Sequence, residues 1–408
     1  MPMLFHITTV PMSLVFLKGQ VPYMRARGLR VHALSSPGPE LGAFGERYDV
    51  PVHAVEMPRS VTPLRDLRAV RGIVRILRRV RPAIVHAHTP KGGLLGMIAA
   101  AAAGVPVRIY HMRGLPLMGA SGPKRALLRW TEIAACRLAH RVFCVSHSIH
   151  QVAIEEGLCA PEKIVVLAGG SGQGVDAADR FDPARQEPGT RGATRARHSI
   201  PDRATVLGFV GRLVRDKGVV ELAEAWGQLR EEYPDLHLLL VGPWEPQDPV
   251  PAEVRERLER DPRVHFSGME WNTPPLYAAM DVLALPTYRE GFPNVPLEAA
   301  AMALPVVATR VPGCVDAVAD GATGTLVPAR DAGALAAALR RYLDDPELRR
   351  RHGTAGRERV LREFQREVIW EATFQEYRRL LAEKGLPLPA AREDSGEVVA
   401  TASGSSVD

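Results

Sequence analysis

The sequence predicts an α/β protein with two Rossmann-like, doubly wound domains that face each other across a cleft. The chain has 408 residues, which is enough for two domains of ordinary size. In both halves short apolar runs alternate with helical patterns, as is typical of parallel sheets with crossover helices. A polar stretch over 176–203 contains three prolines and separates the halves, which indicates a linker.

The first half contains seven apolar runs, each short enough for one buried strand. They read LFHITTV, RVHALSS, VPVHAVEM, AIVHAHT, VRIYHM, RVFCVS and IVVLAGG. Residues 64–80 carry apolar side chains at helical spacing, and seven arginines from Arg65 to Arg81 cover the other faces of this predicted helix. We therefore predict one parallel sheet with its crossover helices over residues 1–183, as the acceptor-side domain.

The second half repeats the alternation after a linker that we place at 184–203. Its apolar runs read TVLGFVG, LHLLLVG, VHFSG, VLALPT, PVVATR and GTLVP. Helical segments separate these runs, so residues 204–356 form the second predicted domain. A long amphipathic helix over 357–384 is expected to pack back toward the first domain, and the small, polar end of the chain, 387–408, is predicted to be disordered.

Composition and charge narrow the setting in which the protein acts. Four cysteines show neither paired spacing nor a nearby histidine pattern, so neither disulfides nor a zinc site are predicted. The longest apolar run is too short to span a bilayer and the first residues lack the features of a secretory signal, which predicts a cytoplasmic protein without a transmembrane helix. Residues 1–180 hold 23 Lys and Arg against 11 Asp and Glu, whereas the rest hold 29 against 35. A basic first half suits an anionic membrane, a nucleic acid or a phosphorylated acceptor.

The stretch PTYREGFPNVPLEAA holds the first chemical motif. Glu290 lies on a glycine-containing loop after a strand, and Glu298 follows eight positions later near the start of a helix. A helix start offers unpaired N–H groups to a phosphate or a polar sugar, and carboxylates accept hydrogen bonds from hydroxyl groups. Glu298 could therefore hold a ribose and Glu290 a sugar. The alternative is that Glu298 complements the helix dipole and Glu290 is a solvated loop charge.

The second motif is GRLVRDKG, where a strand ends and a basic loop precedes a helix. Arg212 and Lys217 can reach one anion from two sides. Two fixed cations would stabilise the charge of a departing nucleoside diphosphate without a metal. A pair of surface charges is the alternative.

Together these motifs resemble the donor domain of the family 4 glycosyltransferases, which are retaining enzymes of the GT-B fold. The resemblance runs from GRLVRDKG through REGFPNVPLEA to DGATGTLVP. It implies that Arg212 and Lys217 hold the diphosphate, Glu298 the ribose and Glu290 the transferred sugar. It also implies a lining for the rest of the nucleotide sugar, with the sugar beside Gly291, Phe292, Pro293 and Asn294, and the base beside Gly268 and Met269.

The first half is similar to bacterial members of the family that extend lipid-linked sugars for surface polysaccharide. TTVPMSLVFLKGQ, VHAHTPKGGLLGMIAA, RGLPLM and CVSHS carry this similarity. Gly19 either brings backbone close to the diphosphate or forms an ordinary turn. The histidine that the family places beside the reacting sugar corresponds here to either His111 or Arg113. His88 and Lys91 are candidates for the acceptor side.

The resemblance implies a transfer with retention of configuration. A hexose or N-acetylhexosamine would pass from a nucleoside-diphosphate sugar, such as a UDP-sugar, to an acceptor hydroxyl, with a polyprenyl-diphosphate-linked saccharide as the expected acceptor. The basic helix and the cluster Lys124, Arg125, Arg129, Arg137 and Arg141 would attach the protein to the anionic inner face of the plasma membrane, or are simply solvated.

No cofactor and no metal are expected. His86 and His88 share a strand face, but neither carboxylate nor cysteine accompanies them at ligand spacing. Two rival functions are a GT-B-fold sugar-nucleotide 2-epimerase and a non-catalytic basic binding protein. Nucleic acid is not an expected partner, because only 6% of residues are aromatic and no stacking platform accompanies the basic residues.

Overall fold

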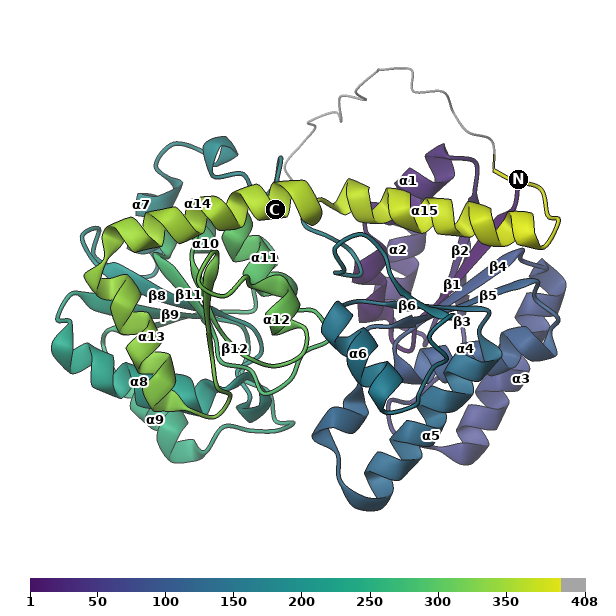
Figure 1. Cartoon of the computed structure of the whole chain (residues 1–408), viewed down its shortest axis with the longest axis horizontal. Helices are drawn as coiled ribbons and strands as arrows, with labels where there is room; N and C mark the ends of the chain where they lie inside the picture. Colours follow the sequence, from purple (N-terminus) through teal and green to yellow (C-terminus); the bar gives the residue numbers. More distant parts are fainter. Residues whose placement is uncertain (390–408) are drawn as a thin grey trace.

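The structure, a computed structural model, describes residues 1–389 of the chain. It consists of two α/β domains, each built on a wholly parallel sheet with flanking helices (Figure 1). The predicted fold class is therefore confirmed. None of the helices within the described residues is both long and apolar enough to cross a membrane.

The first domain has a seven-stranded sheet in the order β3-β2-β1-β4-β5-β6-β7. The order reverses between β1 and β4, and such a switch point leaves a crevice at the carboxyl ends of the strands. The strands are β1 Met3–Ile7, β2 Arg30–Ser35, β3 Val52–Ala54, β4 Ile84–His88, β5 Val107–Met112, β6 Arg141–Cys144 and β7 Ile164–Val166. The helices are α1 Gln20–Ala26, α2 Pro39–Tyr48, α3 Pro63–Val80, α4 Pro90–Ala102, α5 Gly122–Leu138 and α6 His147–Glu155, with 3₁₀ turns at Pro11–Leu17 and Pro116–Gly119.

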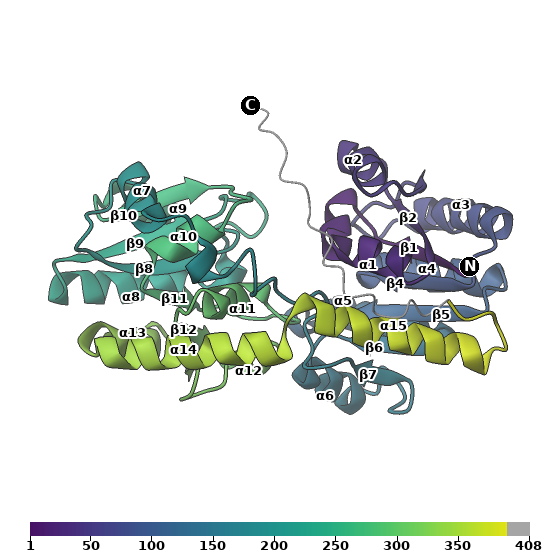
Figure 2. The same ribbon diagram turned by 90° about the horizontal axis from the view of Figure 1, so that it is seen from above.

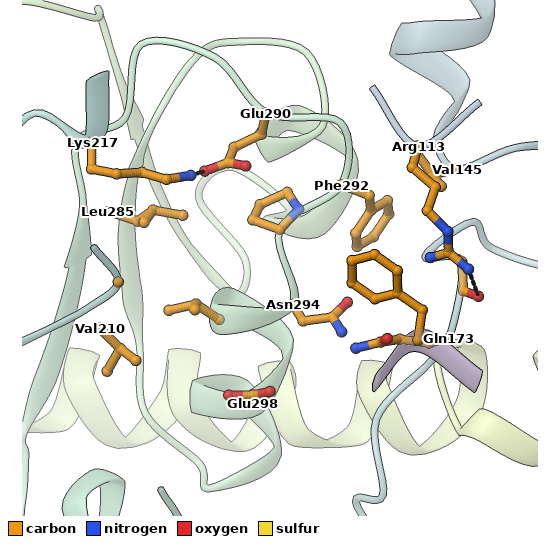
Figure 3. A pocket seen from close by; sticks show the side chains of 15 residues that line it. Arg113, Val145, Gln173, Val210, Lys217, Leu285, Glu290, Phe292, Asn294 and Glu298 are labelled. Atoms are coloured by element: carbon orange, nitrogen blue, oxygen red, sulfur yellow. Dashed lines mark hydrogen bonds and ion pairs between the residues drawn. The ribbon is translucent and has the colours of Figure 1, made fainter. Parts of the chain in front are cut away.

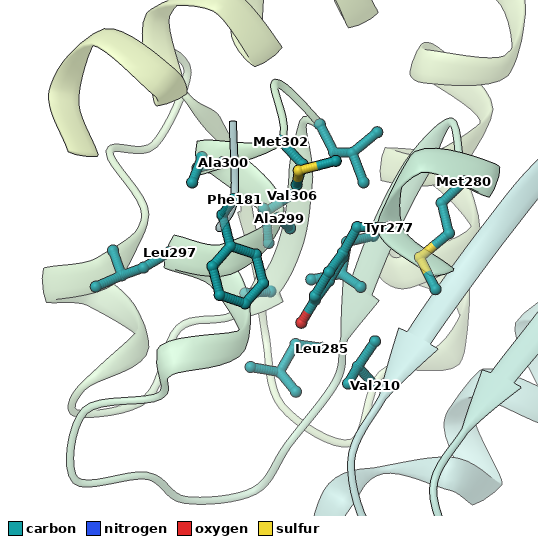
Figure 4. Close-up of a cluster of buried hydrophobic side chains, with 14 of the residues drawn as sticks. Phe181, Val210, Tyr277, Met280, Leu285, Leu297, Ala299, Ala300, Met302 and Val306 are labelled. Atoms are coloured by element: carbon teal, nitrogen blue, oxygen red, sulfur yellow. The ribbon is translucent and has the colours of Figure 1, made fainter. Parts of the chain in front are cut away.

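The second domain has a six-stranded sheet in the order β10-β9-β8-β11-β12-β13, again with one switch point. The strands are β8 Thr205–Val210, β9 Leu236–Val241, β10 Val264–Gly268, β11 Val282–Leu285, β12 Val306–Thr309 and β13 Gly324–Val327. The helices are α7 Thr190–Arg197, α8 Val219–Glu232, α9 Ala252–Arg260, α10 Pro274–Ala279, α11 Asn294–Ala301, α12 Cys314–Ala317, α13 Ala332–Asp344 and α14 Pro346–Glu363, with 3₁₀ turns at Pro183–Arg185 and Arg215–Lys217. Figure 4 shows part of its core, where Tyr277 packs between strands β8 and β11 and helix α11.

The predicted linker over 184–203 is more ordered than its composition suggests. Residues 190–197 form α7, which packs against α10. Arg195 of this helix is only 1% exposed; its guanidinium pairs with Asp281 at 2.9 Å and donates to four backbone carbonyls. The sequence window could not reveal this helix, because the partner that compensates the buried arginine lies far along the chain.

The amphipathic segment 357–384 is two helices, not one. α14 begins earlier, at Pro346, and packs on α11, whereas α15 (Arg366–Glu383) buries Trp370, Phe374 and Tyr377 in the core of the first domain. Seen from above, α14 and α15 lie end to end and pass from one domain to the other (Figure 2). At the crossing, Val175 donates to the carbonyl of Phe364 at 2.8 Å, so the two interdomain connections lie side by side. Apart from 387–389, the predicted disordered tail lies outside the described residues.

Candidate active site

Residues of both domains enclose a cavity of about 350 Å³ at the carboxyl ends of the sheets (Figure 3). The first domain contributes Phe16, Arg113, Val145, Gly172 and Gln173. The second contributes Val210, Gly211, Lys217, Leu285, Glu290, Phe292, Pro293, Asn294, Val295 and Glu298. A second cavity of about 360 Å³ shares Phe16, Arg113, Lys217 and Glu290, and it adds Arg212 and Gly291. The two cavities together form the cleft, and they bring together most of the sequence-predicted site residues.

Lys217 and Glu290 form an ion pair on the second-domain side of the cleft, where Lys217 Nζ donates to Glu290 Oε1. Lys217 ends a 3₁₀ turn, and Gly218 follows with a φ of +73°. A Cβ at Gly218 would lie 1.9 Å from the carbonyl oxygen of Pro286, so only glycine lets the loop approach β11 closely enough to present this lysine.

Glu298 lies in the second turn of α11 and lines the same cavity. Its Oε2 accepts a hydrogen bond of 2.9 Å from the hydroxyl of Tyr277, and burial raises the pKa of the Glu298 carboxyl above its ordinary value. Tyr277 thus fixes one carboxylate oxygen of Glu298 beside the cavity.

Of the two cavities of the cleft, Arg212 lines only the second. Its Nη1 pairs with Glu245 Oε2 at 2.9 Å, and its side chain is 50% exposed. Arg212 and Lys217 were predicted to bind one anion from two sides. Their environments differ, because Lys217 is mostly buried whereas Arg212 is open to solvent.

Arg113 lines both cavities from the first-domain side of the cleft (Figure 3). Its guanidinium stacks on the Phe16 ring with 4.4 Å to the ring centroid, and it makes only two long hydrogen bonds of 3.4 Å, to His88 Nδ1 and to the carbonyl of Gly172. Within residues 1–389 it forms no ion pair, and burial lowers the pKa of Arg113 to about 9. A poorly solvated cation without a carboxylate partner suits a site that receives an anionic substrate.

A cluster of four buried histidines lies directly beneath Arg113. The parallel register pairs His6 of β1 with His86 of β4, and His88 of β4 with His111 of β5. His6 Nδ1 lies 3.0 Å from His88 Nε2, and His86 Nε2 lies 3.2 Å from His111 Nδ1. Burial lowers the pKa of all four rings, that of His6 to about 3, so the cluster is neutral at physiological pH.

The hydrogen bond from Arg113 defines the tautomer of His88. A guanidinium can only donate, so His88 Nδ1 accepts from Arg113, and His88 Nε2 therefore carries the proton that it donates to His6. His86 Nδ1 is 2.6 Å from the hydroxyl of Tyr377 on α15. His6, His86 and His88 each offer a nitrogen within 4.8 Å of the others, as a metal site would require, but a cation there would stand beside the charged Arg113.

Several predicted residues lie away from the two cavities. Gly19 packs against α15, since a Cβ there would meet the Trp370 ring at 2.4 Å. His88 is 1% exposed and accepts a hydrogen bond from Arg113, which does line the cleft. Gly268 is the last residue of β10, an edge strand of the sheet, and Met269 follows it; neither residue lines a cavity of the cleft. Lys91 is ion-paired with Asp66 at 2.7 Å in a different cavity of the first domain.

The sequence did not single out His6, Phe16, Gln173 and Tyr377. A signal for His6 existed, because three apolar strands, FHI, VHAH and YHM, each carry a polar histidine near the carboxyl end. Phe16, Gln173 and Tyr377 carried no such signal, since their neighbours in the fold come from distant segments.

Family models match both halves of the chain. A model described as "Glycosyl transferase 4-like domain" matches residues 15–170, and one described as "Glycosyl transferases group 1" matches residues 204–345. The two matches correspond to the two domains of the structure.

Similar proteins extend this assignment over nearly the whole chain. The capsular polysaccharide biosynthesis glycosyltransferase CapM of Staphylococcus aureus is 32% identical over 381 residues, which is 93% of this chain and 98% of that protein. The UDP-Gal:alpha-D-GlcNAc-diphosphoundecaprenol alpha-1,3-galactosyltransferase of Escherichia coli is 27% identical over 315 residues, or 76% and 79% of the two chains.

Solved structures share the fold. HepE of Anabaena, crystallised with UDP, superposes with a TM-score of 0.76 at 21% identity and covers 92% of this chain and 99% of its own. A glycosyltransferase of Rickettsia africae has a TM-score of 0.78 at 20% identity, with 93% and 98% coverage. On this evidence the protein is an enzyme, and the chain belongs to the family 4 glycosyltransferases of the GT-B fold.

Proposed function

We propose that the protein transfers a hexose or N-acetylhexosamine from a nucleoside-diphosphate sugar to a hydroxyl of a polyprenyl-diphosphate-linked saccharide, with retention at the anomeric carbon. One observation carries the proposal: Lys217, Glu290 and Glu298 of the second domain line one cavity opposite Arg113 of the first. Such a cavity offers cations for a diphosphate and carboxylates for the hydroxyl groups of ribose and sugar. In this arrangement the donor lies on the second domain and the acceptor enters from the first.

Charge stabilisation and positioning account for the proposed chemistry. As the bond between sugar and phosphate breaks, negative charge grows on the diphosphate, and Lys217 with Arg212 stabilises it. Glu290 is paired with Lys217 and Glu298 with Tyr277, so neither carboxylate is set as a nucleophile. The leaving phosphate then accepts the acceptor proton while attack occurs on the same face of the sugar, and domain closure excludes water.

The acceptor is proposed from relatives and from the charge of the first domain. CapM is named for capsular polysaccharide biosynthesis, and the Escherichia coli relative is named for a diphosphoundecaprenol-linked acceptor. A direct test is to incubate the purified protein with a panel of nucleotide sugars and short-chain polyprenyl-diphosphate sugars. A product whose mass has increased by one sugar residue supports the proposal, and an unchanged acceptor across the panel rejects it.

The same incubation separates the transferase from a sugar-nucleotide 2-epimerase. A transferase releases free nucleoside diphosphate in step with product, whereas an epimerase keeps the sugar attached to the nucleotide. An epimerase also needs groups that exchange protons with the sugar, and the four histidines nearest the cleft are each at most 7% exposed. The structure therefore favours the transferase.

Activity is expected to persist in EDTA, because Lys217 and Arg212 are proposed to neutralise the leaving diphosphate. The initial rate should stay within about twofold of the untreated enzyme when the acceptor is water-soluble and its solubility does not depend on divalent cations. Loss of turnover that magnesium or manganese restores would contradict the proposed metal-independent mechanism. A loss that zinc alone restores would instead point to the cluster His6, His86 and His88.

We further propose that α3 binds an anionic membrane on the cytoplasmic side. Arg68, Arg71 and Arg75 are exposed and form no ion pair within the described residues. The basic cluster that includes Arg125 and Arg141 is less available to lipid head groups, because Arg125 pairs with Glu156 at 2.6 Å and Arg141 with Glu376 at 2.9 Å. The row on α3 is therefore the stronger membrane candidate.

Reversing Arg68, Arg71 and Arg75 to Glu is expected to release the protein from anionic vesicles. Wild-type binding should fall steeply with added salt, because exposed charges are screened over about 10 Å at 0.1 M. Cosedimentation with anionic and neutral vesicles measures the effect, and unchanged transfer to a soluble acceptor shows that the variant is folded. If the triple variant cosediments with anionic vesicles as the wild-type protein does, the arginines of α3 are solvated and do not bind the membrane.

A further inference from the structure

A third cavity, of about 440 Å³, lies in the first domain beside the cleft. It is bounded by the starts of α3 and α4 and by α5, and α4 contacts both of the other helices. Its walls are mainly apolar, with Val10, Val61, Leu94, Leu95, Leu127 and Leu128 among the lining residues. A cavity of this character suits an apolar ligand group.

This apolar cavity adjoins the cleft. Ser13, Thr89, Pro90 and Pro116 line both the apolar cavity and the second cavity of the cleft. A substrate whose reacting group lies near Arg113 could therefore extend past Thr89 into the apolar cavity without leaving the protein surface.

Exposed apolar side chains gather on α3 and α5 and just before α3. Among the large hydrophobic residues exposed in the described part of the chain, five lie here: Val61, Leu64, Leu67, Leu127 and Trp130, with exposures of 65%, 78%, 46%, 46% and 62%. Exposed apolar groups that cluster beside a cavity are typical of a ligand or membrane contact.

A basic residue accompanies the apolar walls. Of the two basic residues that line the cavity, Lys91 is ion-paired with Asp66 at 2.7 Å. Arg59 is exposed and forms no ion pair within residues 1–389. The cavity therefore offers an apolar wall together with one cation that is available to an anionic group.

We propose that this cavity binds the first isoprene units of the acceptor lipid, with the lipid diphosphate near Arg59 and the acceptor saccharide in the cleft. The inference rests on the proposed function, because it assumes a lipid-linked acceptor. Such an acceptor consists of a sugar, a diphosphate and a hydrocarbon chain, for which the cleft, Arg59 and the apolar walls respectively offer surfaces. Each group then meets a surface of matching chemistry.

A binding experiment tests the site without turnover. The protein is saturated with UDP to occupy the donor site, and it is then titrated with farnesyl diphosphate and with inorganic diphosphate, which share a head group. Wild type should bind farnesyl diphosphate at least about tenfold more tightly, a difference of about 1.4 kcal/mol. The double variant Val61→Asn/Leu127→Gln should lose this preference, and Val368→Gln, an exposed site of similar accessibility (42%) on α15, should keep it. No preference in wild type, or the same preference in the double variant, would overturn the proposal.

Two further measurements distinguish the proposed lipid site from a bilayer contact and from the proposed reaction. If the double variant loses binding to anionic vesicles but keeps the preference for farnesyl diphosphate, the exposed side chains contact the bilayer and the proposal is overturned. In turnover assays the double variant should lose catalytic efficiency toward a sugar diphosphate with an isoprenyl chain and retain it toward the methyl-linked analogue. Equal losses on both acceptors would overturn the apolar site. Failure of wild type to use any diphosphate-linked sugar, with the farnesyl preference intact, would reject the proposed reaction and leave the binding site standing.

Discussion

Replacing Lys217 by Met is expected to lower turnover by about 10²- to 10³-fold, as loss of one preorganised group that stabilises transition-state charge commonly does. Lys217 is mostly buried and lines both cavities of the cleft. Arg212 is half exposed and tied to Glu245, so Arg212→Met should cost less. Initial rates with saturating donor and a soluble acceptor measure the difference.

Because Lys217 is ion-paired with Glu290, a second variant is needed to interpret the loss of turnover. Without Lys217, the carboxylate of Glu290 would stand unpaired beside the diphosphate and could repel it. The double variant Lys217→Met/Glu290→Gln removes that charge: if turnover stays low, the missing cation is the cause, and if it recovers, repulsion by Glu290 is the cause and the assignment of Lys217 fails. Arg340→Met removes another ion pair, with Glu232 at 2.7 Å, far from the cleft and should leave turnover unchanged.

The fold was predictable because both sheets are parallel and covered on both faces. Strands in such sheets read as nearly continuous apolar runs, and FHI, VLAL and VVAT remain recognisable without any tertiary information. The helix over 64–80 was also predictable, since its apolar residues repeat on one face, and it appears as α3, Pro63–Val80.

The site was predictable only where its residues lie close together in the sequence. Glu290 and Glu298 belong to one loop and helix, and Lys217 follows a neighbouring strand of the same sheet. The hydrogen bond between His86 and Tyr377 joins residues 291 positions apart, and no local pattern connects them. The sequence made His88 a candidate for the acceptor side. It could not show that His88 pairs with His111 of β5 and accepts a hydrogen bond from Arg113, because these contacts join separate strands and loops.

Gly291→Ala is expected to abolish most transfer while leaving both domains folded. A Cβ at this position would lie 2.0 Å from the carbonyl oxygen of Arg113 and 3.0 Å from Gly114 Cα, both in the opposite domain. The φ of Gly291 is not in the left-handed region, so alanine fits its own backbone and conflicts only with the other domain. The clash is therefore relieved by separation of the domains.

Separation of the domains would move Arg113 away from Lys217 and Glu290, and a misplacement of about 1 Å can cost about 10²-fold in rate. Gly291→Ala should thus lower kcat by at least that factor, with an affinity for UDP close to that of wild type, because the proposed nucleotide contacts lie on the second domain. The melting temperature should also stay near that of wild type, and Gly227→Ala in α8, where a Cβ meets nothing within 4 Å, is the matched control. Two hydrogen bonds across the domain interface should weaken together in this variant. Ser146 Oγ donates to the carbonyl of Gly291 at 2.8 Å, and the amide of His147 donates to Asp316 at 3.0 Å. Small-angle scattering would detect the resulting expansion. If the variant turns over at the wild-type rate, the close contact between Gly291 and Arg113 is not part of the catalytic arrangement, and the acceptor must react with the domains farther apart.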